Sequence, residues 1–361
     1  MAVTNDMSAD RRVARHARTL REAGYEVVVV CRSTKENKAS EGLSPLSMQS
    51  PRGWRFYAEY NVLLWRRLMK LKPDAIWAND TDTLPGCWLA ARMLRSKLVM
   101  DAHELFAEVP EIHNKPFVKW VWRTVDRLLM PHCDALLTVC QSVADYNRDK
   151  HGVSMVVVRN LPEKTDAVAV EPSADAWLPS IPAHTPLLLY QGSVNYGRGI
   201  DWAIDALEFL PECVLVVAGK GDVLMQMKER AAARPWADRI MFLGQVPPPV
   251  LPTLTRRAAV GLVMLEDIGL NYRFALPNRI GDFVAAGVPM VVSDMPEMAA
   301  VVRQFGVGEV IDGAGAQPLA NAIKKVLARE WVAGDFAEAR KDMDWDKEKN
   351  KLLKICYTTF C

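Results

Sequence analysis

One segment of the chain combines a turn, a helix start and an acid in a pattern that suits a nucleotide. Residues 270–289 read LNYRFALPNRIGDFVAAGVP, in which a Pro-Asn-Arg turn opens a helix that carries Asp282 in its first turns. A helix start presents unpaired backbone N–H groups and the positive end of a dipole, which suit a diphosphate, and Arg279 adds a fixed positive charge. Asp282 can accept hydrogen bonds from a ribose. The segment therefore predicts a nucleotide-diphosphate site.

Three further clusters follow expected strands in the same half of the chain. Residues 192–199 (GSVNYGRG) form a glycine-punctuated loop whose Arg198 can pair with phosphate oxygens. Residues 219–221 (GKG) and 244–247 (GQVP) follow the next two strands, and the second of these loops can meet a base edge with its backbone. Taken alone, each loop also fits an ordinary turn, and Asp282 also fits an ordinary helix cap. Because carboxyl ends of parallel strands share one sheet edge, their succession predicts one site.

The elements that must position these residues come from a pattern that occurs twice. Short apolar runs alternate with helix-like segments, as in parallel sheets buried on both faces. The predicted fold class is α/β, with two doubly wound Rossmann-like domains that face each other across a cleft, and the Pro-, Ala-, Glu- and Ser-rich stretch 161–186 between them is predicted to be a linker. We expect a helix at 11–23 and strands at 25–31, 74–78, 97–101, 135–139, 155–158, 187–191, 214–219, 240–243, 260–264, 289–293 and 308–311.

Composition narrows the setting. The 361 residues carry a net charge of +2 with 24% charged residues, so nucleic acid is not an expected partner. Seven cysteines without C-x-x-C spacing fit free thiols in a reducing cytosol. The start MAVTNDMSADRRV has no signal-peptide pattern, and no apolar run reaches about 18 residues. We therefore expect a cytoplasmic protein without a membrane-spanning helix.

The motifs, taken in order, carry a family resemblance. GSVNYGRG, AGKGD, FLGQVP and ALPNRIGDFVAAGVPMVVSD resemble the C-terminal half of retaining glycosyltransferases of family 4, which have the GT-B fold. The stretches AIWANDTDTLP, LVMDAHELFAE and CDALLTVCQSVADYNRDKHGVSMVVVRNLPE resemble the acceptor domain of that family, and MDWDKEKNKLLKICYTTF its closing helix. The resemblance implies an acceptor-binding domain at 1–165, joined by the helix 345–361, and a nucleotide-sugar donor-binding domain at 183–340.

The same resemblance assigns the donor residues and shows two departures. In the family motif G-R-x-x-x-x-K-G, Arg198 takes the place of the lysine and Ser193 that of the arginine. In E-x7-E, Asp282 takes the place of the second glutamate and Phe274 that of the first, so we expect the 276–279 turn to take over donor contacts. The implied donor-binding residues are Gly192, Ser193, Gly199, Gly219, Lys220, Gly221, Gln245, Val246, Leu276, Pro277, Asn278 and Asp282.

On the acceptor domain the resemblance points to the residues that follow one strand. His103 is expected to position the donor or acceptor, and Glu104 to contact an acceptor hydroxyl, whereas a lone histidine after a strand is otherwise often structural. The implied catalytic residues are His103, Glu104, Arg198 and Arg279. The implied acceptor-binding residues are Asp10, Asn79 and Asp80, and Asn5 and Asp6 share the first loop with Asp10.

The function that the resemblance implies is retaining transfer of a hexosyl or N-acetylhexosaminyl group. The donor is a UDP- or GDP-linked sugar, and the acceptor is a hydroxyl of a glycan or lipid-linked molecule in cell-surface polysaccharide or glycoconjugate synthesis. No cofactor and no metal are expected, because Arg198, Lys220, Arg279 and a helix start can neutralise the diphosphate. Two alternatives remain: a sugar-nucleotide epimerase of the same architecture, and a non-catalytic partner subunit in which Phe274 marks lost activity.

Basic and aromatic residues crowd two stretches of the first half, 54–70 and 115–123. Amphipathic helices of this composition can lie in a membrane interface and suit a lipid-linked acceptor. Ordinary helices packed on the sheet with solvated charges explain the composition equally well. Peripheral contact with the inner face of the membrane is therefore one of two interpretations that the sequence leaves open.

Overall fold

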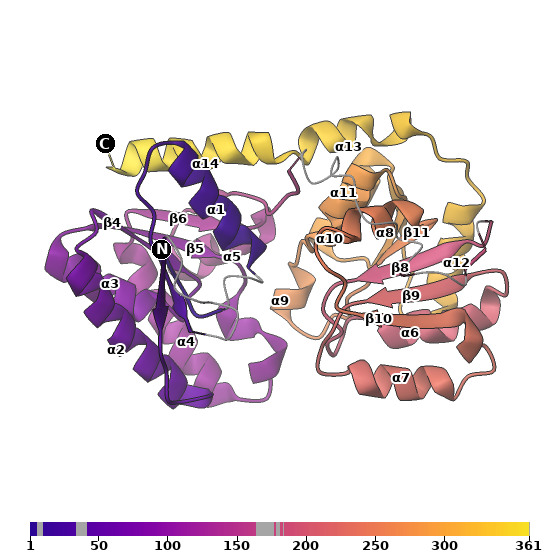
Figure 1. The fold of residues 1–361 in the computed structure, drawn as a ribbon, viewed down its shortest axis with the longest axis horizontal. Coiled ribbons are helices and arrows are strands. Elements are labelled where there is room, and N and C mark those ends of the chain that lie inside the picture. The colour runs from indigo at the N-terminus through magenta and orange to yellow at the C-terminus, as the bar shows by residue number, and fades with distance from the viewer. Residues whose placement is uncertain (6–9, 34–41, 164–176, 178–180, 183, 361) are drawn as a thin grey trace. The chain divides into compact units, whose positions relative to one another are not determined.

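The chain forms two compact α/β units. The structure, a computed structural model, describes residues 1–5, 10–33, 42–163, 177, 181–182 and 184–360. One unit comprises Met1–Asn160 and Glu348–Cys361, and the other comprises Leu161–Lys347. Each unit holds one parallel sheet with helices packed on it, which confirms the predicted fold class of two doubly wound domains (Figure 1).

The sheet of the first unit has seven parallel strands in the order β3-β2-β1-β4-β5-β6-β7. Its central strands are apolar runs without alternation, such as AIWAN in β4, because helices cover both faces. The order reverses between β1 and β4, and ligands of such sheets bind at the carboxyl ends beside this point. The strands are β1 (Ala2–Val3), β2 (Val29–Arg32), β3 (Leu43–Leu46), β4 (Ala75–Asn79), β5 (Lys97–Ala102), β6 (Ala135–Thr138) and β7 (Val156–Val157).

Helices of the first unit cover this sheet, and the C-terminal helix is attached to it by ion pairs. Glu348 accepts hydrogen bonds from the Arg159 side chain at 2.9 Å and the Arg159 backbone at 3.1 Å, and Lys349 donates to Glu22 at 2.8 Å. The helices are α1 (Arg11–Glu22), α2 (Gly53–Leu71), α3 (Leu84–Leu94), α4 (Pro116–Leu129), α5 (Gln141–His151) and α14 (Trp345–Phe360), with 3-10 turns at Phe106–Glu108, Pro110–Ile112 and Met130–His132.

The sheet of the second unit has six parallel strands in the order β10-β9-β8-β11-β12-β13. Successive residues of β8 enter the cores on its opposite faces, Leu187 and Leu189 on one side and Leu188 and Tyr190 on the other. The strands are β8 (Leu187–Gln191), β9 (Val214–Ala218), β10 (Ile240–Gly244), β11 (Val260–Val263), β12 (Met290–Val292) and β13 (Gly308–Val310). The helices are α6 (Ile200–Ala206), α7 (Leu224–Ala232), α8 (Leu251–Arg257), α9 (Leu270–Arg273), α10 (Arg279–Ala286), α11 (Pro296–Phe305), α12 (Ala316–Leu327) and α13 (Ala337–Asp342), with 3-10 turns at Leu207–Phe209, Ala237–Arg239 and Ala333–Phe336.

Three parts of the sequence-based assignment need correction. The strand predicted at 25–31 begins only at Val29, and the short strands β1 and β3 were not predicted. The predicted linker is not free along its described part, because Leu161 and Ile181 are buried in the core of the second unit and Trp177 packs against it. Residues 164–176, 178–180 and 183 of that stretch lie outside the described residues. Within the described chain, no helix is long and apolar enough to cross a membrane.

Candidate functional site

Two glycine loops of the second unit interlock backbone to backbone. The N–H of Gly192, after β8, donates to the carbonyl of Ala218 at 2.9 Å, and the N–H of Val194 donates to the carbonyl of Lys220 at 3.0 Å. A Cβ on Gly219 would overlap the carbonyl oxygen of Gly192, and one on Gly221 would overlap that of Val194. The glycines are thus required by the close approach of the two backbones, which an isolated tight turn would not need.

Arg279 lies directly beneath the first of these loops. Its side chain is 6% exposed, its Nη1 donates to the carbonyl of Gln191 at 2.9 Å, and its guanidinium carbon lies 4.5 Å from the ring centroid of Tyr190. In the described part of the chain, its Nε and Nη2 are buried and have no hydrogen-bond partner. A buried cation with unused donors costs free energy unless an acceptor binds there, so this arrangement favours an anionic ligand.

Helix α10 begins at Arg279 and carries Asp282 in its first turn, as the sequence predicts. The residue before the helix, Asn278, makes no capping bond with its side chain. Asp282 lies inside the helix rather than at its N-cap position, and its Oδ2 accepts a hydrogen bond from Nε2 of Gln191 at 3.2 Å. The acid is half-buried at the carboxyl end of β8, close to the glycine loops.

Arg198 stands on the far end of the first glycine loop. Its guanidinium carbon lies 4.8 Å from the ring centroid of Tyr272, whose hydroxyl donates to the carbonyl of Tyr196 at 2.9 Å. Stacking on this ring holds the arginine over the loop that α9 supports. In the described structure its Nε is buried and makes no hydrogen bond.

The other predicted donor residues fall into two environments. Ser193 and Lys220 are exposed, and the carbonyl of Ser193 accepts the Tyr190 hydroxyl at 2.6 Å. Gly199 has a φ of 63° and directly precedes α6, so the left-handed turn there favours glycine. Val246 is buried in the core, which leaves only its backbone for a ligand, whereas Gln245 and Asn278 are exposed and Leu276 and Pro277 half-buried.

In the first unit, His103 lies between two aspartates. Its Nδ1 is 3.3 Å from Oδ2 of Asp80, and its Nε2 is 3.3 Å from Oδ2 of Asp101. Burial pushes the pKa of His103 down, but the charges of Asp80 and Asp101 outweigh it and raise the pKa to about 9. Both ring nitrogens face carboxylates, which favour the imidazolium form.

Asp80 holds the backbone as well as the ring of His103. It has a φ of 64°, which is uncommon for a residue other than glycine, and its Oδ1 accepts the backbone N–H of His103 at 2.6 Å. Burial raises the pKa of Asp80 against the opposing effect of His103. Strained backbone that is locked by hydrogen bonds is typical of functional loops.

The partners on the other side of Asp101 were missed by the sequence analysis. Arg12 donates two hydrogen bonds to Asp101, from Nε to Oδ2 at 2.9 Å and from Nη2 to Oδ1 at 2.6 Å. On the same carboxylate, Oδ2 lies 3.2 Å from Nδ1 of His16. Burial, followed by the charge of Arg12, lowers the pKa of His16 to about 4. The spacing of the two residues could have predicted this cluster. Arg12 and His16 are four residues apart on one helix face, which also carries the core residue Val13.

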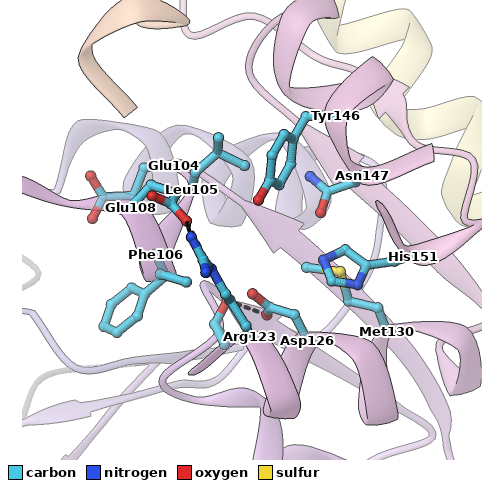
Figure 2. Close-up of a pocket in the computed structure, with 12 residues that line it drawn as sticks. Glu104, Leu105, Phe106, Glu108, Arg123, Asp126, Met130, Tyr146, Asn147 and His151 are labelled. Carbon is cyan, nitrogen blue, oxygen red and sulfur yellow. Dashed lines mark hydrogen bonds and ion pairs between the residues drawn. The ribbon is translucent and has the colours of Figure 1, made fainter. Parts of the chain in front are cut away.

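Glu104 lines a pocket of the first unit with about 300 Å³ of empty space, its open mouth included (Figure 2). Asp126 forms part of its wall and accepts a hydrogen bond from Thr81 at 2.7 Å, and burial raises the pKa of Asp126 to about 7. Arg123 donates to Glu108 across the same pocket at 2.9 Å. The remaining lining residues are Leu105, Phe106, Ala107, Met130, Tyr146, Asn147 and His151.

The remaining predicted acceptor residues have structural partners. Asp10 caps α1 by accepting the N–H of Val13 at 3.0 Å. Asn79 is 1% exposed, and its amide donates to the carbonyl of Ala2 at 2.8 Å. Asn5 is exposed, and Asp6 lies outside the described residues. The described part of the chain holds no group of three or more His, Cys, Asp or Glu side chains arranged to bind a metal ion.

Comparison with known families decides what kind of protein carries this arrangement. The model for Glycosyltransferase Family 4 matches residues 9–161, and the model for Glycosyl transferases group 1 matches residues 177–349. The chain belongs to glycosyltransferase family 4. A phosphatidyl-myo-inositol mannosyltransferase of Mycobacterium leprae is 28% identical over 169 residues, and a D-inositol 3-phosphate glycosyltransferase of Xylanimonas cellulosilytica is 24% identical over 191 residues. These matches cover 45% and 48% of this chain and 43% of each relative.

Solved structures share the fold of this family member over nearly its whole length. Sucrose-phosphate synthase of Thermosynechococcus elongatus has a TM-score of 0.80 at 18% identity, over 96% of this chain and 92% of that one. The Anabaena protein HepE, solved in complex with UDP-glucose, has a TM-score of 0.78 at 13% identity, over 99% and 98%. At these identities the comparison establishes the GT-B fold.

Proposed function

We propose that this family 4 member is a retaining glycosyltransferase that uses a UDP- or GDP-linked hexose or N-acetylhexosamine. The observation that carries the proposal is Arg279, a buried guanidinium with unused donors beneath the first of two interlocked glycine loops. The diphosphate lies over the Gly192 loop, where Arg279 and Arg198 neutralise it, and its ribose faces Asp282 at the start of α10. UDP-glucose bound to the structurally similar HepE supports a UDP-sugar as the first donor to test.

The diphosphate is the leaving group, so its developing charge must be stabilised for the sugar bond to break. Two arginines and the N–H groups before α10 supply that stabilisation from fixed positions. His103 and Glu104 contact the transferred sugar or the acceptor hydroxyl. The sugar transfers with retention of the anomeric configuration to a hydroxyl of a glycan or lipid-linked acceptor in polysaccharide or glycoconjugate synthesis.

Donor choice and metal use can be tested together. Thermal shift with UDP-, GDP- and other nucleotide sugars identifies the donor, and release of nucleoside diphosphate with and without acceptor measures turnover. We expect release to continue in EDTA, because arginines take the role that Mg²⁺ has in metal-dependent transferases. Activity that disappears in EDTA and returns with Mn²⁺ would refute the metal-independent mechanism. Interconversion of nucleotide sugars without release would instead identify an epimerase, and binding without any reaction a non-catalytic subunit.

Asp282→Asn is expected to weaken binding of a ribonucleotide by about tenfold, because it weakens one charge-assisted hydrogen bond to the ribose hydroxyls. The loss should be smaller for the 2′-deoxy nucleotide, which lacks one of those hydroxyls. Calorimetric titration of UDP and 2′-deoxy-UDP measures both. Equal losses for the two nucleotides would mean that the acid does not contact the ribose.

Peripheral attachment to the inner face of the cytoplasmic membrane is proposed from exposed aromatic residues on α2 and α4. Trp54 is 76% exposed, Phe117 72% and Trp120 60%, and Phe117 stacks on Trp120 with ring centroids 5.9 Å apart. The two helices are neighbours, since the ring centroids of Tyr57 on α2 and Trp122 on α4 lie 4.9 Å apart. Exposed aromatics beside cations such as Arg55 suit the interface of an anionic bilayer.

A vesicle sedimentation assay tests this attachment. The double variant Trp54→Ser/Trp120→Ser should lower binding to phosphatidylglycerol vesicles by about tenfold or more. The reason is that two aromatic rings that would insert into the membrane interface are lost. Tyr357→Ser on α14, where the ring is 53% exposed, serves as the matched control. Equal binding by the double variant and the parent would leave the two helices as ordinary solvated elements.

A further inference from the structure

Gln191 occupies the junction between the two charged residues of the candidate donor site. It is the last residue of β8 and is 2% exposed. Its backbone carbonyl accepts Nη1 of Arg279 at 2.9 Å, and its side-chain Nε2 donates to Oδ2 of Asp282 at 3.2 Å. One residue therefore contacts both the proposed phosphate-binding cation and the proposed ribose-binding acid.

The far end of the Gln191 amide is held by a second helix. Its Oε1 lies 2.9 Å from the hydroxyl of Thr255, on α8, which shares its single proton with the carbonyl of Leu251 at 2.7 Å, and Thr255 is 1% exposed. A carboxylate can only accept hydrogen bonds, so the amide nitrogen must face Asp282 and the amide oxygen must face the hydroxyl. The amide thus has one orientation that satisfies both neighbours, because rotation would turn its oxygen toward the carboxylate of Asp282.

We propose that Gln191 is a positioning residue that directs the carboxylate of Asp282 toward the donor ribose; this inference rests on the proposed function. Aspartate is one methylene shorter than the glutamate that the family motif places there, so the direction of its carboxylate decides whether it reaches the ribose. A buried, doubly held amide supplies that direction before the nucleotide binds. Thr255 contributes through Gln191 and contacts neither charged residue in the described hydrogen bonds.

The two contacts of Gln191 can be separated by mutation. The bond to Arg279 comes from the backbone carbonyl, so it survives a change of side chain. Gln191→Leu should therefore disturb ribose recognition and leave diphosphate binding in place. We expect UDP affinity to fall about tenfold and the preference for UDP over 2′-deoxy-UDP to shrink, while affinity for inorganic pyrophosphate stays within about twofold.

A double-mutant cycle tests whether Gln191 acts through Asp282. In an Asp282→Asn background, Gln191→Leu should change UDP affinity by less than about twofold, because the group that it positions has already been altered. Thr255→Val should give a smaller loss of the same preference. Gln317→Leu, an exposed glutamine of the same unit that contacts Asn321, is the matched control and should change nothing.

Gln191→Glu adds a readout that a purely structural role would not produce. The new carboxylate would face Asp282 at a hydrogen-bond distance, and two such groups hold one proton between them. The charged side chains in contact with residue 191 in the described structure are Asp282 and Arg279. UDP affinity of this variant should rise as the pH is lowered from about 8 to about 6, because the shared proton restores a donor to Asp282.

Two results would overturn the inference, and they are distinguishable. If the parent prefers UDP or GDP over its 2′-deoxy form and Gln191→Leu keeps the full preference, Gln191 does not position Asp282 and the proposed function stands. If the parent binds neither nucleotide, the proposed function fails and the inference fails with it. Circular dichroism of each variant verifies the fold, and Gln191→Glu and Thr255→Val provide the test should Gln191→Leu not fold.

Discussion

Arg279→Ala is expected to weaken binding of a nucleoside diphosphate by about 10- to 150-fold. The substitution removes a buried guanidinium whose Nε and Nη2 have no hydrogen-bond partner in the described structure, and a charge-assisted bond to phosphate contributes about 1.5 to 3 kcal/mol. Arg198→Ala should cause a loss in the same range. Calorimetric titration with UDP and GDP measures both variants.

Matched variants distinguish a lost phosphate contact from a damaged fold. Arg279→Lys keeps the charge but not the planar fork, so we expect an intermediate loss. Arg303→Ala removes a cation of the same unit that is 61% exposed and paired with Asp294, and it should bind as the parent does. Parent-like affinity in both Arg279→Ala and Arg198→Ala would place the nucleotide elsewhere.

Asp101→Asn is expected to lower the free energy of unfolding by about 3 to 5 kcal/mol, because it leaves the buried guanidinium of Arg12 without its counter-charge. It also removes the carboxylate that contacts both His16 and His103. Urea unfolding followed by tryptophan fluorescence measures the change. Asp145→Asn, which breaks an exposed pair with Arg148 on α5, should cost less than about 1 kcal/mol. Equal costs for the two variants would show that the Asp101 pair contributes no more than a surface pair.

The same cluster predicts sensitivity to acid. Burial opposes ionisation of Asp101, but the charges of Arg12 and His103 hold its pKa well below the usual range. The pKa of His16 falls from 6.5 to about 4, so the stability that it contributes is present above pH 6.5 and is lost as the pH falls toward 4. We expect unfolding free energy to decline over this window, and to decline less in His16→Leu. An unchanged pH profile in that variant would contradict the assignment.

Much of the fold, and the loops and helix start of the candidate donor site, could be predicted because the signals are local. Apolar runs such as 187–191 and 214–218 mark buried strands, and glycine loops after them mark the sheet edge. The turn before Arg279 likewise predicts the start of α10. By contrast, β1 has two residues, and β3 contains Pro45 and depends on its pairing with β2. Neither strand has a pattern of its own, so neither could be predicted.

The sequence by itself determined the fold class and the order of motifs, because periodicity, turn residues and the rule of strand ends act within short windows. Only the tertiary structure decided which polar groups meet: Gln191 contacts Asp282 across 91 residues of sequence, and Arg12 contacts Asp101 across 89. Such partners are chosen by how strands and helices pack, since buried charges and amides must find hydrogen-bond partners wherever the fold places them. No periodic pattern encodes those pairings along the chain.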